Sequence, residues 1–283
     1  MNGILIVNKT KGYTSHDIVA KVKKITHEKV GHTGTLDPLA TGVLPLLIGK
    51  GTLCSKYLIN HDKKYIVLLK IGEKTSTGDS EGDILEKLNV DINVFYDVEN
   101  IFNSFIGEQE QIPPIYSAIK VNGKKLYEYA RKNQEVKIEP RKINIYSIKI
   151  LKLDKEKNEI QFEVKCSKGT YIRSLCEDIA TRLGTVGYMK ELNRIEVGEF
   201  NINQAIDVEN LTENDISKKI INIEEIFEKN SSIELTKRKL ELFLNGVNLT
   251  VQNQNGIYKI YSENKFIGIG IVKDKLLKRD IVI

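Results

Sequence analysis

One stretch of the sequence combines residue types that could do chemistry. It runs GHTGTLDPLATGVLP, from Gly31 to Pro45, and holds a single carboxylate among glycine, threonine and apolar residues. That carboxylate is Asp37, and the following Pro38 favours an extended backbone at Asp37, which would fix the direction of its side chain. Aspartate beside glycine and proline most often forms an Asx-type turn or cap, and the spacing alone favours that role. The alternative is a nucleophile or base in a loop of low polarity.

Arg173 bears on this choice. It lies in the first turn of a predicted helix, residues 171–183, where a cation opposes the helix dipole. Glu177 follows four residues later and could pair with it on the surface, for about a few tenths of a kcal/mol. A pair with Asp37 would instead lower the pKa of that carboxyl by about 1 to 3 and keep it ionised. The sequence alone does not decide whether Arg173 pairs with Glu177 or with Asp37.

The apolar pattern predicts the elements that must position these side chains. A short buried strand is expected at 4–7, before a helix that begins at Thr14 with Asp17 as its capping-box partner. The apolar run 65–71 predicts a buried strand, and the polar stretch 75–82 predicts a loop. Further along we expect helices at 98–106, from about Leu126 and at 171–183, an antiparallel strand pair at 143–153 and 160–166, and a tight turn at 121–124.

The C-terminal quarter differs from the rest in composition. Seven acidic residues against three lysines in 201–229 suggest a domain boundary there. Beyond it, residues 235–244 are helical in period, and 256–283 read as short strands with glycines, typical of a small β-barrel. The chain therefore looks like a larger α+β domain followed by a small β domain.

Positive charge is concentrated in one region. The whole chain has a formal net charge of +5, but residues 117–152 contain ten Lys and Arg against three Glu, so that this region carries +7 and the remainder −2. Tyr127, Tyr129 and Tyr146 lie among these charges, with Tyr116 just before them. This mixture suits a nucleic acid, whose phosphates attract cations and whose bases stack on aromatic rings. A merely solvated basic face is the alternative.

Several classes of protein are excluded by composition. The longest dense apolar stretch, 43–48, is far too short to cross a bilayer, and the N-terminus lacks the features of a leader peptide, so we expect a cytoplasmic protein. Three widely spaced cysteines predict neither a disulfide framework nor a zinc site. Phosphate-binding loops and nucleophile elbows are missing from the sequence, which disfavours most nucleotide and cofactor enzymes.

Four segments resemble the TruB family of tRNA pseudouridine-55 synthases, in family order. They are GHTGTLDPLATGVLP from Gly31, KKYIVLLKIG from Lys63, IPPIYSAIKVNGKKLYEYAR from Ile112 and CSKGTYIRSL from Cys166. In addition, NKFIGIG from Asn264 is similar to the end of a PUA-type RNA-binding domain. The resemblance implies a pseudouridine synthase fold, with a mixed, largely antiparallel sheet flanked by helices in residues 1–228, and a small PUA-like β-barrel in 229–283.

The resemblance also implies an activity and a site. The enzyme would isomerise uridine 55, in the T-arm loop of tRNA, to pseudouridine. Asp37 would be the catalytic aspartate, Tyr65 would stack on the everted uracil, and Arg173 would position Asp37 through an ion pair. Neither metal nor cofactor is expected, and a monomer would act on tRNA without a protein partner. Whether Asp37 attacks C1′ of the sugar, attacks C6 of the base or assists through a glycal is left open.

Five further residues are candidates for substrate binding by the same resemblance: His32, Tyr171, Leu192, Lys9 and Lys120. The two lysines would contact phosphates. His32 would hold the everted nucleotide, although a plain loop residue remains the alternative, and Leu192 would lie beneath the base, although it reads equally as core. Two other functions stay open. One is a guide-RNA-dependent scaffold subunit of the same fold, and the other is an RNA-folding module that opens and re-forms the tRNA elbow.

Overall fold

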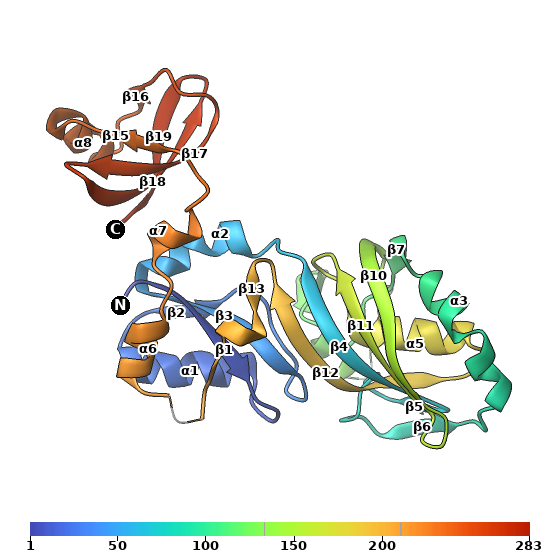
Figure 1. The fold of residues 1–283 in the computed structure, drawn as a ribbon. Coiled ribbons are helices and arrows are strands. Elements are labelled where there is room, and N and C mark those ends of the chain that lie inside the picture. The colour runs from blue at the N-terminus through green and yellow to red at the C-terminus, as the bar shows by residue number, and fades with distance from the viewer. Residues whose placement is uncertain (133, 210) are drawn as a thin grey trace.

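The structure is a computed structural model that describes residues 1–132, 134–209 and 211–283. Its larger body is built on a ten-stranded mixed sheet with the order β14-β1-β3-β12-β4-β11-β10-β7, where β13 pairs with β12 and β2 with β3 (Figure 1). The strands are β1 (Gly3–Lys9), β2 (Val30–His32), β3 (Thr41–Ile48), β4 (Lys63–Ile71), β7 (Gly107–Gln111), β10 (Arg141–Asp154), β11 (Glu159–Cys166), β12 (Gly187–Val197), β13 (Phe200–Asn201) and β14 (Ile206–Asp207).

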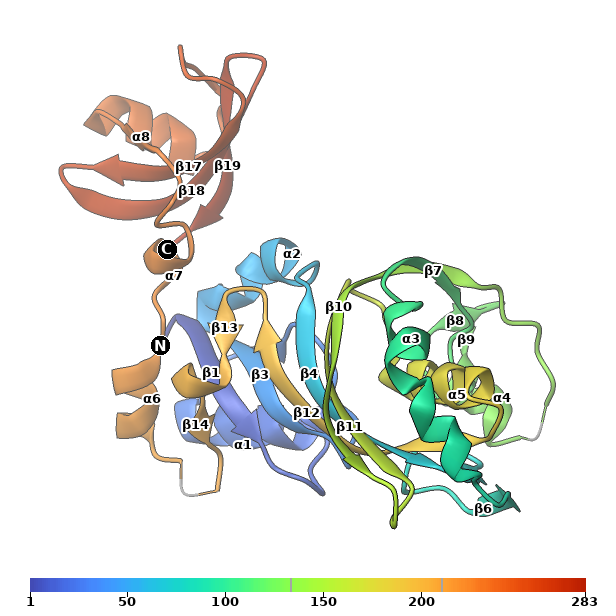
Figure 2. The ribbon, with the colours of Figure 1, turned by 45° about the vertical axis from the view of Figure 1, so that its right-hand side comes forward.

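Most neighbours in this sheet are antiparallel, and the parallel pairs are β1 with β14 and β3 with β12. One face packs against the longer helices, and Figure 2 shows α5 and α3 beside β10 and β11. The helices of this body are α1 (Ser15–Thr26), α2 (Ser55–Leu58), α3 (Val98–Asn103), α4 (Leu126–Ala130), α5 (Ile172–Arg182), α6 (Glu213–Lys219) and α7 (Ile223–Ile226), and two small hairpins add β5 (Glu73–Thr75) with β6 (Ile84–Lys87) and β8 (Lys120–Val121) with β9 (Lys124–Lys125).

Local sequence explains several of these elements. The Thr14 hydroxyl accepts a hydrogen bond from the Asp17 amide and the Asp17 carboxylate accepts one from the Thr14 amide, so the predicted capping box begins α1. β4 buries every second residue from Tyr65 onward, and β10 pairs with β11 as expected. The predicted turn forms at Asn122 and Gly123, both with positive φ. The helix expected at 98–106 is shorter and ends at Asn103.

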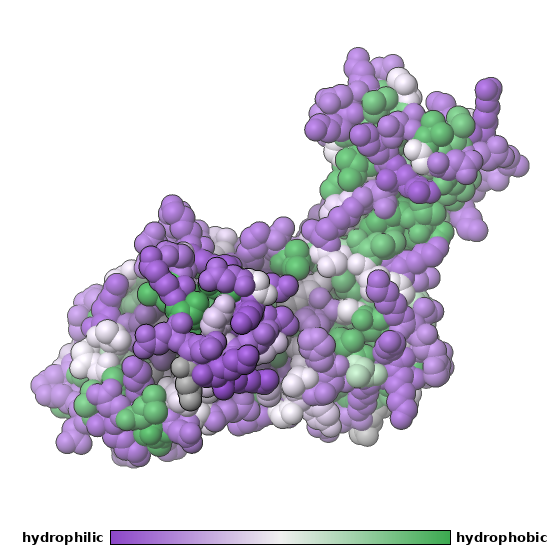
Figure 3. Space-filling view, turned by 180° about the vertical axis from the view of Figure 1, so that it is seen from behind, coloured by the Kyte–Doolittle hydropathy of each residue, from purple (hydrophilic) through white to green (hydrophobic). Residues whose placement is uncertain are grey.

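The C-terminal residues form a separate five-stranded sheet with the order β15-β17-β18-β19-β16, flanked by α8. Its elements are β15 (Ser232–Glu234), α8 (Lys237–Leu244), β16 (Leu249–Thr250), β17 (Gly256–Ser262), β18 (Lys265–Lys273) and β19 (Leu276–Val282). The curved sheet fits a PUA-like domain, and α8 begins two residues later than expected. In Figure 3 this lobe projects from the larger body, and apolar surface gathers near the junction. Ile269 and Ile281 of the lobe are buried in one cluster with Phe227, which follows α7.

The acidic segment 201–229 belongs largely to the first body. Ile206 pairs with Val7 in the large sheet, and Ile4 and Ile221 exchange two backbone hydrogen bonds of 2.9 and 2.8 Å. The chain therefore passes from one sheet to the other between Ile221 and Ser232. Among the described helices, none combines the length and the apolarity needed to cross a membrane.

Gly42 in β3 provides a test of the packing between β3 and β12. Its φ is +105°, and a Cβ there would lie 2.2 Å from the backbone oxygen of Arg194. We expect Gly42→Ala to lower the free energy of unfolding by about 2 to 4 kcal/mol, because it adds backbone strain and a steric clash. Gly12→Ala is the matched control, since Gly12 also has positive φ but open space around it. Denaturant unfolding that gives equal losses for the two variants would contradict the close approach.

Candidate active site

The loop between β2 and β3 carries Asp37 and is held by a turn of its own backbone and by hydrogen bonds to the start of α1. The Ala40 amide donates to the Asp37 carbonyl at 3.0 Å, which makes the turn with backbone atoms and leaves the carboxylate for other partners. At the start of α1, the Ser15 hydroxyl accepts from the Leu36 amide at 2.9 Å and donates to the Leu36 carbonyl at 3.2 Å. The loop is thus held by the helix whose start the sequence predicted.

The guanidinium of Arg173 faces the Asp37 carboxylate. Its Nε lies 3.1 Å from Asp37 Oδ2, and its Nη2 lies 3.5 Å from Oδ1. Arg173 is only 6% exposed and also donates to the carbonyl of Tyr116 at 3.0 Å and to that of Thr77 at 3.4 Å. Of the two partners that the sequence left open, Asp37 is the one that this side chain contacts.

A second carboxylate, Asp79, lies on the same guanidinium and was missed in the sequence. Its Oδ2 is 3.8 Å from Arg173 Nε, and its Oδ1 accepts hydrogen bonds from the Thr77 hydroxyl at 2.5 Å and the Glu81 amide at 3.1 Å. Asp79 is buried. Its surroundings in the sequence predicted only a polar loop, and nothing in that pattern distinguishes a buried carboxylate from a solvated one. Arg173 therefore lies between two carboxylates.

The pKa of Asp37 corrects an expectation. Burial raises the pKa of this carboxyl above its ordinary value, Arg173 opposes that effect, Asp79 adds to it, and Lys9 again lowers the pKa. The expected depression by Arg173 is present but is outweighed by desolvation. The Asp37 side chain is nevertheless 36% exposed, so a substrate can reach it.

Tyr65 and Leu192 lie on the neighbouring central strands β4 and β12, where Tyr65 is opposite Arg194 and Leu192 is opposite Val67. Each is 7% exposed, and both pack in the same core cluster as Leu36 and Leu39 from the Asp37 loop. Burial raises the pKa of Tyr65 to about 12, so the phenol stays neutral at physiological pH. Arg194, which is opposite Tyr65 on β12, opposes this rise. With Leu36 and Leu39, these two side chains form an apolar wall against the loop that carries Asp37.

His32 lies half-buried at the end of β2. Its Nδ1 accepts a hydrogen bond from the Gly34 amide at 3.3 Å, which leaves Nε2 as the donor. The ring meets that of His16 edge-on, with centroids 5.7 Å apart. Burial, His16 and Arg194 all lower the pKa of His32, so the imidazole is neutral at pH 7. A neutral ring with one free donor can bind a nucleotide without adding charge.

The two lysines differ from each other in exposure. Lys9 is fully buried, and its ammonium donates to the carbonyls of Thr10 at 3.0 Å and Pro38 at 3.1 Å. Burial lowers the pKa of Lys9 to about 8. The expected phosphate contact does not fit a buried amine whose bonds go to the loop next to Asp37. Lys120 is exposed on β8 and remains available to a phosphate.

Tyr171 precedes α5 and is held by a residue that the sequence did not single out. The buried Gln111 side chain accepts from the Tyr171 amide at 2.8 Å and donates to its carbonyl at 3.0 Å. This amide pair fixes the backbone two residues before Arg173. The Tyr171 side chain is half-buried, so its contact with a substrate remains a prediction.

Residues 117–152, here called the basic segment, begin beside the ion pair of Arg173 with Asp37. The Tyr116 carbonyl accepts from Arg173, and the Ser117 carbonyl accepts from the Tyr127 amide at 3.1 Å, which brings the β8–β9 hairpin and α4 next to Arg173. The exposed cations on this segment include Lys120, Lys124, Arg131 and Lys132. The segment that carries these cations therefore begins next to the ion pair of Arg173 with Asp37.

Comparison with known proteins identifies the family. The model "TruB family pseudouridylate synthase (N terminal domain)" matches residues 22–172, and "tRNA pseudouridylate synthase B C-terminal domain" matches 173–226. This chain belongs to the TruB family. It is 44% identical to tRNA pseudouridine synthase B of Clostridium tetani, with 95% of each chain covered, and 44% identical to that of Clostridium novyi, with 98% of each covered.

Solved structures confirm the pseudouridine synthase fold. A crystal structure of a Cbf5–Nop10–Gar1 complex matches with a TM-score of 0.67 and 25% identity over 99% of this chain and 83% of that one. The structure of an H/ACA RNP bound to a substrate RNA containing 2′-deoxyuridine matches with a TM-score of 0.69 and 22% identity, over 99% of this chain and 85% of that one, and shows the likeness of fold alone.

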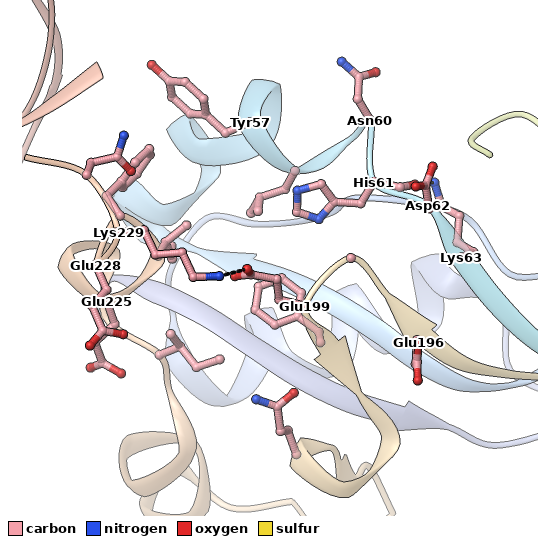
Figure 4. Close-up of a pocket in the computed structure, with 18 of the residues that line it drawn as sticks. Tyr57, Asn60, His61, Asp62, Lys63, Glu196, Glu199, Glu225, Glu228 and Lys229 are labelled. Atoms are coloured by element: carbon pink, nitrogen blue, oxygen red, sulfur yellow. Dashed lines mark hydrogen bonds and ion pairs between the residues drawn. The ribbon is translucent and has the colours of Figure 1, made fainter. Parts of the chain in front are cut away.

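A large pocket in this TruB-family chain lies away from Asp37. It measures about 730 Å³ and opens where the two bodies meet (Figure 4). Its lining comes from the start of β4, the turn after β12 and the segment after α7, and includes the ion pair of Lys229 with Glu199. Asp37, Tyr65 and Arg173 do not line it, so it is separate from the carboxylate site.

The charges around Arg173 predict how Asp37 titrates. A carboxyl-carbon NMR titration should place the pKa of Asp37 above the ordinary value of about 3.9. Asp79→Asn should lower that pKa, because the Asp79 charge raises it in the wild type. Asp178→Asn, on α5 but absent from the groups that act on Asp37, is the control and should leave the pKa in place. An unchanged or higher pKa in Asp79→Asn would contradict the arrangement of two carboxylates.

Proposed function

We propose that this protein isomerises a uridine of tRNA to pseudouridine at position 55, in the T-arm loop. A single chain is proposed to suffice, because the Asp37 loop, Arg173 and the apolar wall all come from one chain. The reaction is proposed to occur in the cytoplasm, with tRNA as the substrate. Family membership and relatives named tRNA pseudouridine synthase B support the activity.

The observation that carries the proposal is the ion pair of Arg173 with Asp37. Pseudouridine formation breaks the N-glycosidic bond, turns the uracil and rejoins it through carbon. This isomerisation gives a carboxylate the role of nucleophile or base, for which it must be ionised and aimed. Arg173 supplies both conditions, since its buried guanidinium opposes protonation of Asp37 and holds both carboxylate oxygens. The exposed part of the carboxylate is left to meet the sugar or the base.

The apolar wall accounts for how the base would be received. A uracil stacked in a folded loop must be everted, which costs about a few kcal/mol. Stacking of the everted uracil on Tyr65 would offset about 1 to 3 kcal/mol of that cost. Leu192 would extend the same wall, His32 would hold the everted nucleotide, and Tyr171 would contribute a further substrate contact. Because the phenol of Tyr65 is neutral, it adds no charge beside the ionised Asp37.

The basic segment is proposed to bind the T-arm backbone. Lys120, Lys124, Arg131 and Lys132 are exposed, and Tyr116, whose carbonyl accepts from Arg173, immediately precedes this segment. Phosphates bound there would lie next to the carboxylate site. Association driven by such contacts releases counterions and therefore weakens as salt concentration rises.

A guide-RNA-dependent scaffold is the competing function. The Cbf5-containing complexes share the fold, but the relatives at 44% identity are named as tRNA enzymes. Unmodified tRNA incubated with the purified protein alone, followed by chemical mapping of pseudouridine, separates the two. Product in the T-arm loop without added RNA or protein supports the proposal. Product that requires an added RNA or protein would favour the scaffold.

Asp37→Asn tests the carboxylate directly. We expect product formation to fall by at least about 10,000-fold, because the amide is neither a nucleophile nor a base. The dissociation constant for tRNA should change by no more than about threefold, since Asp37 contributes one small contact. Single-turnover product formation and filter binding measure the two effects. Normal turnover by this variant would refute the assignment, whereas an RNA-folding activity would survive the substitution.

Four substitutions to glutamine test the basic segment: Lys124→Gln, Lys125→Gln, Arg131→Gln and Lys132→Gln. Together they should reduce the slope of log affinity against log salt concentration by about 3 to 4, if each cation neutralises one phosphate. Binding of unmodified tRNA at several salt concentrations measures the slope.

A matched control removes the same charge elsewhere. Lys23, Lys24, Lys29 and Lys50 are exposed, in the last turn of α1, just before β2 and just after β3. Their replacement by glutamine should leave the slope almost unchanged. An equal decrease in both variants would indicate a general charge effect instead of a T-arm contact at 117–152.

A further inference from the structure

Arg194 is a buried cation at the centre of the large sheet. It is 2% exposed and lies on β12, between β3 and β4. Its backbone is in register with Gly42 of β3 on one side and with Tyr65 of β4 on the other. One residue thus connects the strand that follows the Asp37 loop with the strand that carries the stacking tyrosine.

The Arg194 side chain closes the loop that carries Asp37. Its Nε donates to the Val43 carbonyl at 2.8 Å, its Nη2 to the Gly34 carbonyl at 3.0 Å, and its Nη1 approaches the Thr35 carbonyl at 3.5 Å. Gly34 and Thr35 precede Asp37, whereas Val43 follows it. The rigid fork of the guanidinium therefore holds both arms of the loop at once.

The same side chain acts on Tyr65. Burial raises the pKa of the Tyr65 phenol and lowers that of Arg194, and the interaction between the two groups opposes both changes. The close approach of β3 to β12 depends on Gly42, where any Cβ would meet the Arg194 carbonyl. The loop, the tyrosine and the guanidinium are thus one packed unit.

The charge of Arg194 has no carboxylate within ion-pair distance among the described residues. Its acceptors are backbone carbonyls, and burying a cation without a counter-ion is unfavourable. An apolar side chain of the same length would avoid that cost. The geometry that the fork imposes on the loop is therefore the physical contribution that only arginine makes here.

We propose that Arg194 is a positioning residue that fixes the Asp37 loop relative to Tyr65. The effect of Arg194 on the reaction rate rests on the proposed function, whereas its effect on the Asp37 loop does not. Arg194 touches neither the carboxylate nor the exposed part of the site, so it acts through the atoms that it holds. Its loss should leave Asp37 ionised and accessible but poorly placed.

Hydrogen exchange tests the effect on the loop without any substrate. In Arg194→Met, amides in residues 33–43 should exchange at least about tenfold faster, because the two arms of the loop are released. Arg194→Lys keeps a cation but lacks the fork, so it should give an intermediate increase in the exchange rates of these amides. It also keeps the test valid if the methionine variant folds poorly. Val197→Ala is the matched control, since Val197 is buried on the same strand but packs in another cluster.

Single-turnover measurements on unmodified tRNA test the effect on rate. At a temperature well below each variant's melting midpoint, the rate constant of Arg194→Met should fall by about 10- to 100-fold, with tRNA affinity within about threefold of wild type. Val197→Ala should lose stability but keep its rate constant.

Two outcomes would overturn the inference. One is unchanged exchange in 33–43 in both Arg194 variants, and the other is a uniform increase across the sheet like that of Val197→Ala. A wild-type protein that forms no pseudouridine would refute the proposed function instead, and the exchange data would still decide the role of Arg194.

Discussion

A guanidinium taken out of water must be surrounded by acceptors, and the site is organised around Arg173 for this reason. Burial of an ion costs several kcal/mol unless its hydrogen bonds are replaced. The replacements come from Asp37, Asp79, Thr77 and Tyr116, which lie on three segments far apart in the chain. The requirement therefore brings together the loop before β3, the turn after β5 and the start of the basic segment. Placing Asp37 is a consequence of satisfying Arg173.

The two members of the central ion pair differ in exposure, and this difference gives the site its chemistry. Arg173 is enclosed, whereas the Asp37 carboxylate is open on one side. The enclosed guanidinium of Arg173 fixes the orientation of the Asp37 carboxylate, and the open side of that carboxylate can reach a substrate. Desolvation raises the pKa of Asp37, and two cations, Arg173 and Lys9, act against it. The carboxylate is kept less hydrated than in water, a state that favours reaction.

Local patterns predicted the elements whose residues interact with near neighbours. The capping box of α1, the apolar run of β4 and the helical period of α5 depend on residues close together in the sequence, and all three elements formed as expected. Burial alternates along β4, which the continuous apolar run did not predict. Strands β3 and β12 were not predicted. From Val43 onward β3 is apolar without alternation and contains a proline, and two register shifts in β12 break the alternation of that strand. A bulge changes the face of every later side chain, which removes the period of two.

The sequence by itself determined the family, the carboxylate at Asp37 and Arg173 as a candidate partner, because these depend on residue types in a specific order. Only the tertiary structure decided that Arg173 contacts Asp37, that Asp79 lies on the same guanidinium, and that Lys9 and Arg194 are buried supports of the loop. The physical reason is that a polar side chain acquires its role from burial and from its partners. Arg173 and Asp37 lie 136 positions apart in the chain, and Arg194 and Gly34 lie 160 apart, so no local pattern carries that information.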